Sequence, residues 1–127
     1  MRVTLDTNRY IDFCKGEAGA LEVIRKAERI FITFVVLAEL RAGFRVGSRG
    51  EENERVLVQF LNSTRVETLY ADEQTTHHYA RLFFQLRKQG TPIPTNDLWI
   101  AALAAQHDLI LFARDQHFDH LPQLPRV

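Results

Sequence analysis

Four acidic residues in this chain have the types and positions best suited to a chemical role. Each lies at a junction between an apolar run and a polar or helical segment: Asp6, Glu39, Asp97 and Asp115. In an open α/β fold the carboxyl ends of parallel strands lie along one edge of the sheet, so side chains from distant sequence positions meet there. We therefore expect the four carboxylates to gather at one edge of a parallel sheet.

Gathered carboxylates repel one another and need a compensating charge. Two of them about 5 Å apart repel by roughly 3 kcal/mol at an effective dielectric constant of about 20. Either protons bind and the pKa values rise, or a divalent cation binds, and oxygen ligands of this kind suit Mg²⁺ or Mn²⁺. The chain has neither a Cys and His ligand set nor a cofactor motif. A cation held by carboxylates and water is typical of phosphodiester hydrolysis.

The acids depend on strands and helices that alternate along the chain. Apolar runs predict strands at residues 2–5, 30–36, 65–70 and 109–112, with a possible edge strand at 124–127. Helical spacing, caps and glycine stops predict helices at residues 9–15, 18–27, 35–46, 51–61, 72–89, 97–105 and 117–121. These repeated units predict an α/β fold, a three-layer α/β/α sandwich with a mainly parallel central sheet.

Length and composition favour an ordinary globular protein. With 127 residues, 46% hydrophobic and 25% charged, the chain fits one domain over residues 1–127. The lone Cys14 excludes an intramolecular disulfide, and the N-terminus enters a predicted strand directly. Both features favour a cytoplasmic protein. No apolar run approaches the roughly 20 residues that cross a bilayer, so we expect no membrane-spanning role.

Three arginines offer a local contact for a polyanion. The formal net charge is zero, which argues against broad nonspecific affinity for nucleic acid. Arg41, Arg45 and Arg49 recur every four residues after Glu39, so one helix would place them in a row beside that carboxylate. This row is a candidate phosphate track. A solvated helix face with nearby acids explains the same pattern, and both interpretations stay open.

Each acid also has an ordinary structural explanation. The alternatives are a helix cap for Asp6, an ion pair with an arginine for Glu39, a first-turn acid for Asp97 and a turn residue for Asp115. If all four structural explanations were correct, four unrelated acids would lie at the same sheet edge by chance. The joint pattern therefore favours a functional cluster. His117 and His120 are interpreted as surface or loop histidines, because no second soft ligand lies at suitable spacing.

Four short motifs occur in order along the chain. They are Leu5-Asp6-Thr7-Asn8, Leu37-Ala38-Glu39-Leu40-Arg41, Asn96-Asp97-Leu98-Trp99-Ile100-Ala101-Ala102 and Ala113-Arg114-Asp115-Gln116-His117-Phe118. Each motif is short, but the ordered set is specific and spans the whole chain. Together the motifs resemble a PIN-domain ribonuclease of the VapC toxin type.

The resemblance implies a PIN-like α/β/α fold and endonucleolytic cleavage of RNA that depends on Mg²⁺ or Mn²⁺. It also implies a homodimer and a cognate VapB-like antitoxin that occupies the active-site groove. Asp6, Glu39 and Asp97 match the three strongest acidic positions of the family, and Asp115 matches the fourth. On this basis Asp6 and Asp97 are expected to be the main metal ligands. Asn8 is expected to orient Asp6 or a bound water, although a helix-cap role explains it equally well.

The last motif departs from the family pattern at two positions. Family members often have Ser or Thr in place of Ala113 and a further Asp in place of His117. One hydrogen-bonding group and one outer carboxylate are therefore missing, which weakens the expectation of a firmly held second ion.

Other protein classes fit less well. A phosphatase of the haloacid dehalogenase type would need a general acid where this chain has Asn8. A receiver-type phosphoacceptor domain would need adjacent acids after the first strand and a late lysine, whereas Lys88 is the last lysine. A noncatalytic RNA-binding or protein-interaction module on a PIN-like fold is the remaining alternative, and metal binding would distinguish it from an enzyme.

Overall fold

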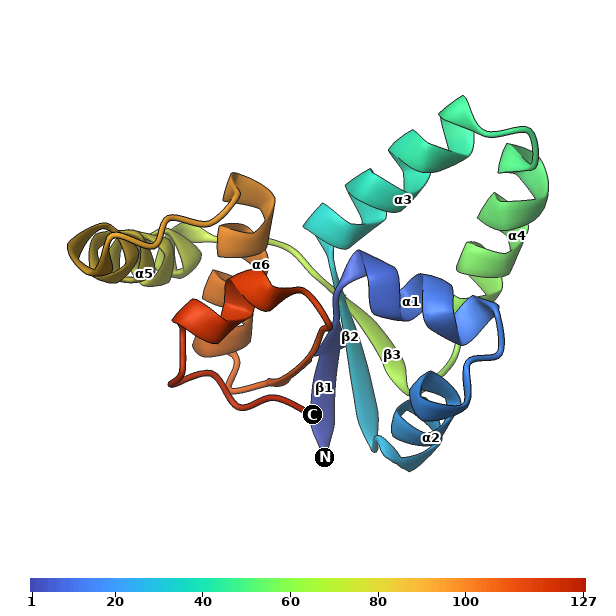
Figure 1. The fold of residues 1–127 in the computed structure, drawn as a ribbon. Coiled ribbons are helices and arrows are strands. Elements are labelled where there is room, and N and C mark those ends of the chain that lie inside the picture. Colours follow the sequence, from blue (N-terminus) through green and yellow to red (C-terminus); the bar gives the residue numbers. More distant parts are fainter.

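The computed structural model describes residues 1–127, in which strands and helices alternate (Figure 1). The strands are β1 (Arg2–Leu5), β2 (Arg29–Thr33), β3 (Val66–Leu69) and β4 (Ile110–Phe112). The helices are α1 (Thr7–Cys14), α2 (Ala18–Lys26), α3 (Phe34–Val46), α4 (Gly50–Leu61), α5 (Glu73–Gln89), α6 (Thr95–Gln106) and a 3₁₀ helix, η1 (Gln116–His120). None of these helices has the length and apolar character needed to cross a membrane.

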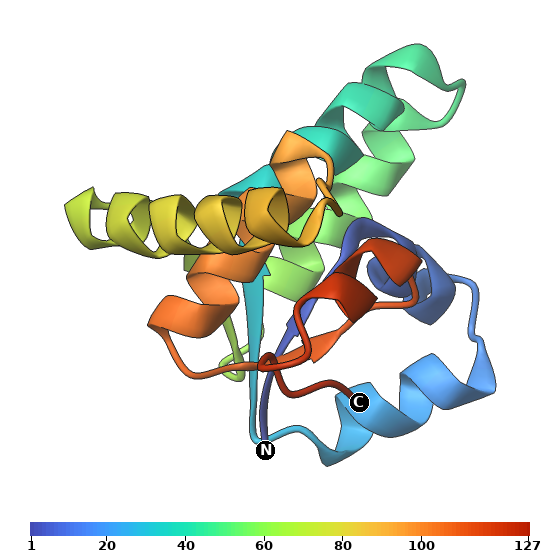
Figure 2. The same cartoon turned by 60° about the vertical axis from the view of Figure 1, so that its left-hand side comes forward.

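The strands form one parallel sheet in the order β3-β2-β1-β4. Helices α1, α2 and α4 lie on one side of the sheet, and α6 and η1 lie on the other (Figure 1). Helix α5 packs across the outer side of α6, as the turned view shows (Figure 2). The predicted three-layer α/β/α sandwich with a parallel sheet is thus confirmed.

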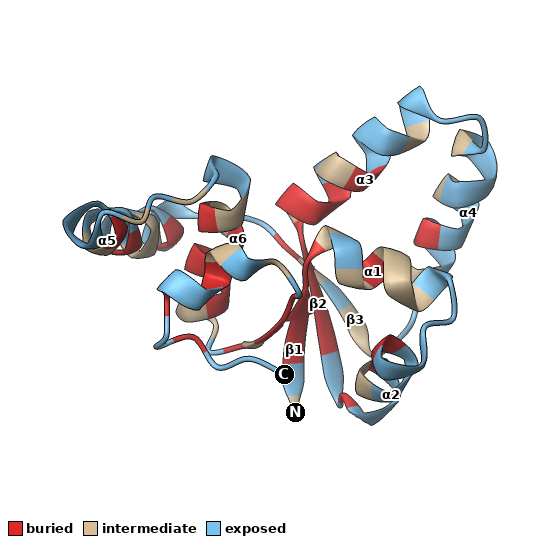
Figure 3. Cartoon of the chain, in the orientation of Figure 1, coloured by how far each residue is buried: buried red, intermediate tan, exposed pale blue.

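The core lies along the two central strands and α6 (Figure 3). Val3, Leu5, Ile30 and Ile32 are almost fully buried between the helical layers. Helix α6 is buried from Ile100 to Ala104 without interruption, so it is apolar on nearly all sides. A helix enclosed in this way has little freedom to shift, and it therefore holds its first turn in a fixed position against the sheet.

The carboxyl ends of the strands define the edge at which the site is expected. Helix α3 begins directly after β2, and both the first turn of α6 and η1 lie at the same end of the sheet (Figure 1). The two chain termini lie at the opposite end (Figure 1). The topology therefore brings segments from both ends of the sequence to one edge of the sheet.

Two predicted strands differ from the structure. The strand expected at residues 30–36 ends at Thr33, whose hydroxyl accepts a hydrogen bond from the Val36 backbone N–H at 3.3 Å and caps α3. Valines favour strands locally, but here a threonine cap and tertiary packing outweigh that preference. The expected edge strand at residues 124–127 is reduced to an isolated bridge between Leu111 and Arg126.

Candidate metal centre

Asp6 lies where β1 passes into α1. Its backbone N–H donates to the Phe112 carbonyl at 3.1 Å, which continues the pairing of β1 with β4. Its Oδ1 accepts a hydrogen bond from the Arg9 backbone N–H at 2.8 Å, so Asp6 is the N-cap of α1. The side chain is buried, with 5% of the residue exposed. A carboxylate has two oxygens, so the predicted capping role is real and still leaves acceptor capacity for a cation.

Glu39 lies on α3 and is held from two sides. Its Oε1 accepts a hydrogen bond from the Thr7 hydroxyl at 2.6 Å, and its Oε2 accepts one from the Asn96 side-chain amide at 3.3 Å. These partners are the residues that follow Asp6 and precede Asp97 in the sequence. Glu39 therefore links the end of β1 to the start of α6. The alternative of an ion pair with an arginine is wrong, because neutral donors hold this carboxylate.

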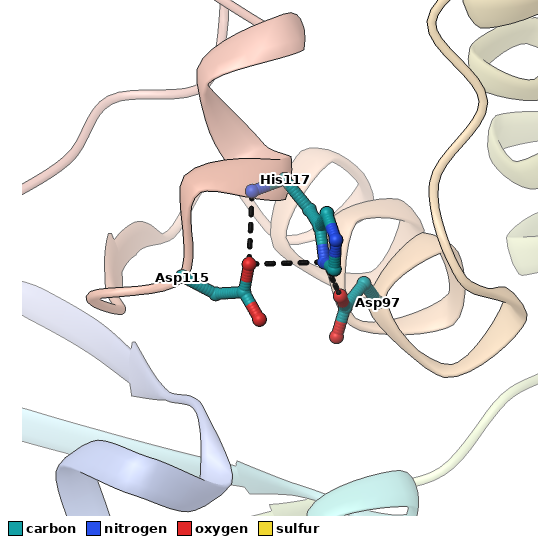
Figure 4. A group of neighbouring side chains, drawn as sticks. All are labelled: Asp97, Asp115 and His117. Atoms are coloured by element: carbon teal, nitrogen blue, oxygen red, sulfur yellow. Dashed lines mark hydrogen bonds and ion pairs between the residues drawn. The ribbon is translucent and has the colours of Figure 1, made fainter.

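The ring of His117 contacts the carboxylates of both Asp97 and Asp115 (Figure 4). The His117 Nδ1 lies 2.8 Å from the Asp97 Oδ2 and 2.9 Å from the Asp115 Oδ1. The Asp115 Oδ1 also accepts a hydrogen bond from the His117 backbone N–H at 2.9 Å, which makes Asp115 the N-cap of η1. One ligand atom from each of the three residues lies within 4.8 Å of the others.

The segment that carries Asp115 is anchored by two arginines. The Arg114 guanidinium donates to both oxygens of Asp12 on α1, with Nε–Oδ2 and Nη2–Oδ1 distances of 2.9 and 3.0 Å. The Arg126 guanidinium donates to the Ala113 carbonyl at 2.8 Å and to the Asp115 carbonyl at 3.3 Å. These bonds hold the segment between β4 and η1 from both flanks, so the position of Asp115 does not depend on its own contacts alone.

The electrostatics of the edge are unfavourable to negative charge. Burial raises the pKa of Asp97 above its ordinary value of 3.8, the His117 hydrogen bond lowers it, and the charges of Asp115 and Glu39 raise it further. Burial likewise raises the pKa of Asp6, against the lowering effect of backbone N–H groups and of the Arg9 and Arg114 charges. Repulsion between carboxylates thus contributes to the raised pKa of Asp97, whereas burial alone raises that of Asp6.

The donor set fits a divalent cation. Carboxylate oxygens suit Mg²⁺ and Mn²⁺, and an imidazole nitrogen is an accepted ligand of first-row transition ions. A cation placed among these groups would also relieve the repulsion that raises the pKa of Asp97. The arrangement can thus hold a cation at the edge of the sheet and present it to an anionic substrate.

The predicted arginine row is wrong in one respect. Helix α3 ends at Val46, and Arg49 is the residue that precedes α4, so Arg49 does not continue the row. Arg41 forms a two-point ion pair with Glu54, at 3.1 and 2.9 Å, as the solvated-face interpretation expects. A turn beginning at Gly47 breaks the helix that the row requires.

Two further residues near the acids bear on the site. His117, interpreted as a surface or loop histidine, lies beside Asp97 and Asp115, a contact that the sequence interpretation missed. Its spacing of two residues from Asp115, at a position where the resemblance places a carboxylate, was the available signal. Asn8 is exposed on the first turn of α1, and its role in orienting Asp6 stays a prediction.

A groove of about 620 Å³ runs beside the cluster between α1, α3 and α4. Its walls include Tyr10, Leu40, Phe44 and Val56, and Glu39 is the one of the four acids that lines it. Charged and polar side chains, among them Lys15, Arg49 and Glu52, line the groove as well, so it suits a ligand with both apolar and charged groups.

Comparisons with known proteins agree with this geometry. Residues 3–124 match the PIN domain family. Ribonuclease VapC1 of Haemophilus influenzae is 34% identical over 115 residues, which cover 87% of this chain and 84% of that protein. Ribonuclease VapC5 of Mycobacterium tuberculosis is 32% identical over 114 residues, which cover 90% of this chain and 83% of that protein.

Solved structures show the same fold. VapBC-1 from nontypeable Haemophilus influenzae aligns with a TM-score of 0.87 and 30% identity, over 100% of this chain and 97% of that one. VapBC2 from Rickettsia felis, bound to a DNA fragment from their promoter, aligns with a TM-score of 0.85 and 29% identity, over 100% and 98%. The chain therefore belongs to the PIN-domain family, and within it to the VapC group.

Proposed function

We propose that this protein is a metal-dependent endoribonuclease that hydrolyses RNA phosphodiester bonds, as the toxin of a VapBC-type toxin–antitoxin system. The observation that carries the proposal is the cluster at the carboxyl edge of the sheet, where Asp97 and Asp115 meet at His117 and where Glu39 is bonded to Thr7 and Asn96, the sequence neighbours of Asp6 and Asp97. The similarity to proteins named Ribonuclease VapC supports the choice of RNA as substrate. A cytoplasmic location is part of the same proposal.

The cofactor is proposed to be Mg²⁺ or Mn²⁺. Asp6, Asp97 and Asp115 would hold it, and when bound it would supply a Lewis acid for the phosphate and lower the pKa of attacking water. Glu39 has a different part, because it is the acid that also faces the groove. With both of its oxygens oriented by Thr7 and Asn96, it is placed to align the attacking water and accept its proton.

The partner is proposed to be a VapB-like antitoxin. The solved relatives include VapBC structures, in which a toxin of this type is seen with such a partner. In this chain the groove beside Glu39 has apolar side chains in its walls, and it is the surface proposed to bind the antitoxin. A homodimer stays a prediction. The exposed aromatic side chains of Phe83 and Phe84 on α5 support it, because a second subunit could bury them.

A noncatalytic RNA-binding or protein-interaction module is the alternative. Such a module has no need to keep buried acids whose charges repel one another, since neutral residues would be more stable there. The burial of Asp6 and the proximity of Asp97 to Asp115 therefore favour the enzyme.

Asp97→Asn should abolish cleavage. The amide keeps the shape of the side chain but removes the charge that holds the cation, and even changes beside metal ligands lower activity about 10 to 100-fold. We expect a loss of more than about 100-fold in cleavage of total RNA with Mg²⁺ or Mn²⁺, measured beside a chelator control. Asp108→Asn is the matched control, because Asp108 is exposed beyond the far end of α6 and Asn tolerates its positive φ of 53°. Full activity of Asp97→Asn would exclude the proposed site.

The same substitution should stabilise the metal-free protein at neutral pH. A raised pKa means that folding disfavours ionised Asp97, so the wild type loses stability as pH rises from about 4 through the raised pKa. The neutral amide avoids this loss. A tenfold change in an acid dissociation constant on folding corresponds to about 1.4 kcal/mol, or roughly 5 °C in melting temperature for a chain of this size.

Thermal unfolding in chelator should therefore show a melting temperature difference between Asp97→Asn and wild type that is positive at pH 7 and shrinks toward pH 4. Added Mn²⁺ should raise the melting temperature of the wild type only. A difference that is constant with pH, or that grows as pH falls, would contradict a destabilising charge at Asp97.

The free arginines should contribute more to RNA binding than the paired one. Arg45 and Arg49 are exposed, whereas Glu54 neutralises Arg41. In the Asp97→Asn background, alanine at Arg45 or Arg49 should weaken RNA binding and lower the slope of log K against log salt by about 0.7 per lost phosphate contact. Arg41→Ala serves as the control and should change the slope little. Equal slopes for all three variants would remove the arginines from the RNA interface.

A further inference from the structure

His117 has a place in the site that a surface histidine does not have. Its Nδ1 faces two carboxylates at once, at 2.8 Å from Asp97 and 2.9 Å from Asp115 (Figure 4). Its own backbone N–H is bonded to the Asp115 Oδ1 at 2.9 Å, so the start of η1 fixes the residue beside that carboxylate. The backbone of His117 therefore holds its ring within the cluster.

One ring nitrogen cannot serve two carboxylates well by hydrogen bonding. Nδ1 carries at most one proton, and that proton can point along a straight line to one acceptor only. A cation bound by the Nδ1 lone pair and by both carboxylates satisfies all three groups together. Ligand atoms at right angles around a six-coordinate ion with bonds of about 2.1 Å lie about 3 Å apart, close to the two observed separations.

The second ring nitrogen of His117 also has access to a hydrogen-bond partner. Ligation through Nδ1 places the proton on the other ring nitrogen, which then needs an acceptor. The His117 side chain is 44% exposed, so water can meet that need. The Asp97 and Asp115 side chains are less exposed than the ring, at 17% and 33%.

We propose that His117 is a direct nitrogen ligand of the catalytic cation, together with Asp97 and Asp115, and that it makes the site select Mn²⁺ over Mg²⁺. The inference rests on the proposed function and specifies its cofactor. Mg²⁺ strongly prefers oxygen ligands and retained water, whereas imidazole suits transition ions. With His117 added to the carboxylates of Asp6, Asp97 and Asp115, the donor set has one nitrogen among its oxygens, so it favours the ion that accepts both.

Pulsed electron paramagnetic resonance of bound Mn²⁺ tests the ligand directly. Wild-type protein loaded with Mn²⁺ should show ¹⁴N coupling from a coordinated imidazole, and His117→Asn should lose it. His120→Asn is the matched control on the same short helix, because His120 is exposed and lies outside the cluster. It should keep the coupling. Circular dichroism and thermal unfolding establish that each variant is folded.

Calorimetric titration with Mn²⁺ and with Mg²⁺ tests the selectivity. His117→Asn should lower Mn²⁺ affinity about 10 to 100-fold and Mg²⁺ affinity much less. His117→Asp replaces the nitrogen by oxygen, so it should keep cation binding without ¹⁴N coupling and shift the preference toward Mg²⁺. This variant separates loss of the ligand from loss of the fold.

The outcomes distinguish this inference from the proposed function. Mn²⁺ binding that requires Asp97 but shows no ¹⁴N coupling in the wild type would overturn ligation by His117 and leave the nuclease proposal standing. Unchanged selectivity in folded His117→Asn would overturn the inference as well. Absence of any Mn²⁺ or Mg²⁺ binding by the wild type would overturn both.

Discussion

Mutual repulsion among carboxylates at one edge of a parallel sheet is the constraint on which the rest of the structure depends. Burial and the charges of Asp115 and Glu39 raise the pKa of Asp97, so the cluster is held together against its own electrostatics. Folding must supply the free energy that this requires. It does so through elements that are rigid for other reasons: a buried sheet, a helix enclosed on nearly all sides, and arginine anchors around Asp115.

The residues that donate hydrogen bonds to Glu39 are the sequence neighbours of two other acids, which explains how a small fold positions all of them. Asp6 follows β1 while its neighbour Thr7 donates to Glu39, and Asn96 donates to Glu39 while its neighbour Asp97 lies beside Asp115 and His117. A shift of one element would therefore disturb two acids at once. Because of this coupling, the positions of the acids depend on the whole sheet and its helices, and the acids act as one cluster.

Sequence reasoning reached the fold class and the approach of Asp97 to Asp115 and Glu39, because both follow from strand order and strand ends. It missed His117, because the contact of this ring with Asp97 depends on how η1 lies beside α6. The arginine row failed because it extended four-residue spacing across the break between the helices predicted at residues 35–46 and 51–61, and that break is present in the structure. The end of β2 depended on a cap at Thr33 that competes with the strand preference of the valines. The Thr33 cap and the break after Val46 are local features, whereas the contact of His117 with Asp97 joins residues 20 positions apart.

The most direct test of the account is anomalous X-ray scattering at the manganese absorption edge from crystals equilibrated with Mn²⁺. We expect a strong anomalous peak at the carboxyl edge of the sheet, within bonding distance of Asp97 and Asp115 and beside Asp6. No peak at this edge at saturating Mn²⁺, or a peak confined to another part of the surface, would contradict the claim that these distant acids form one cation site.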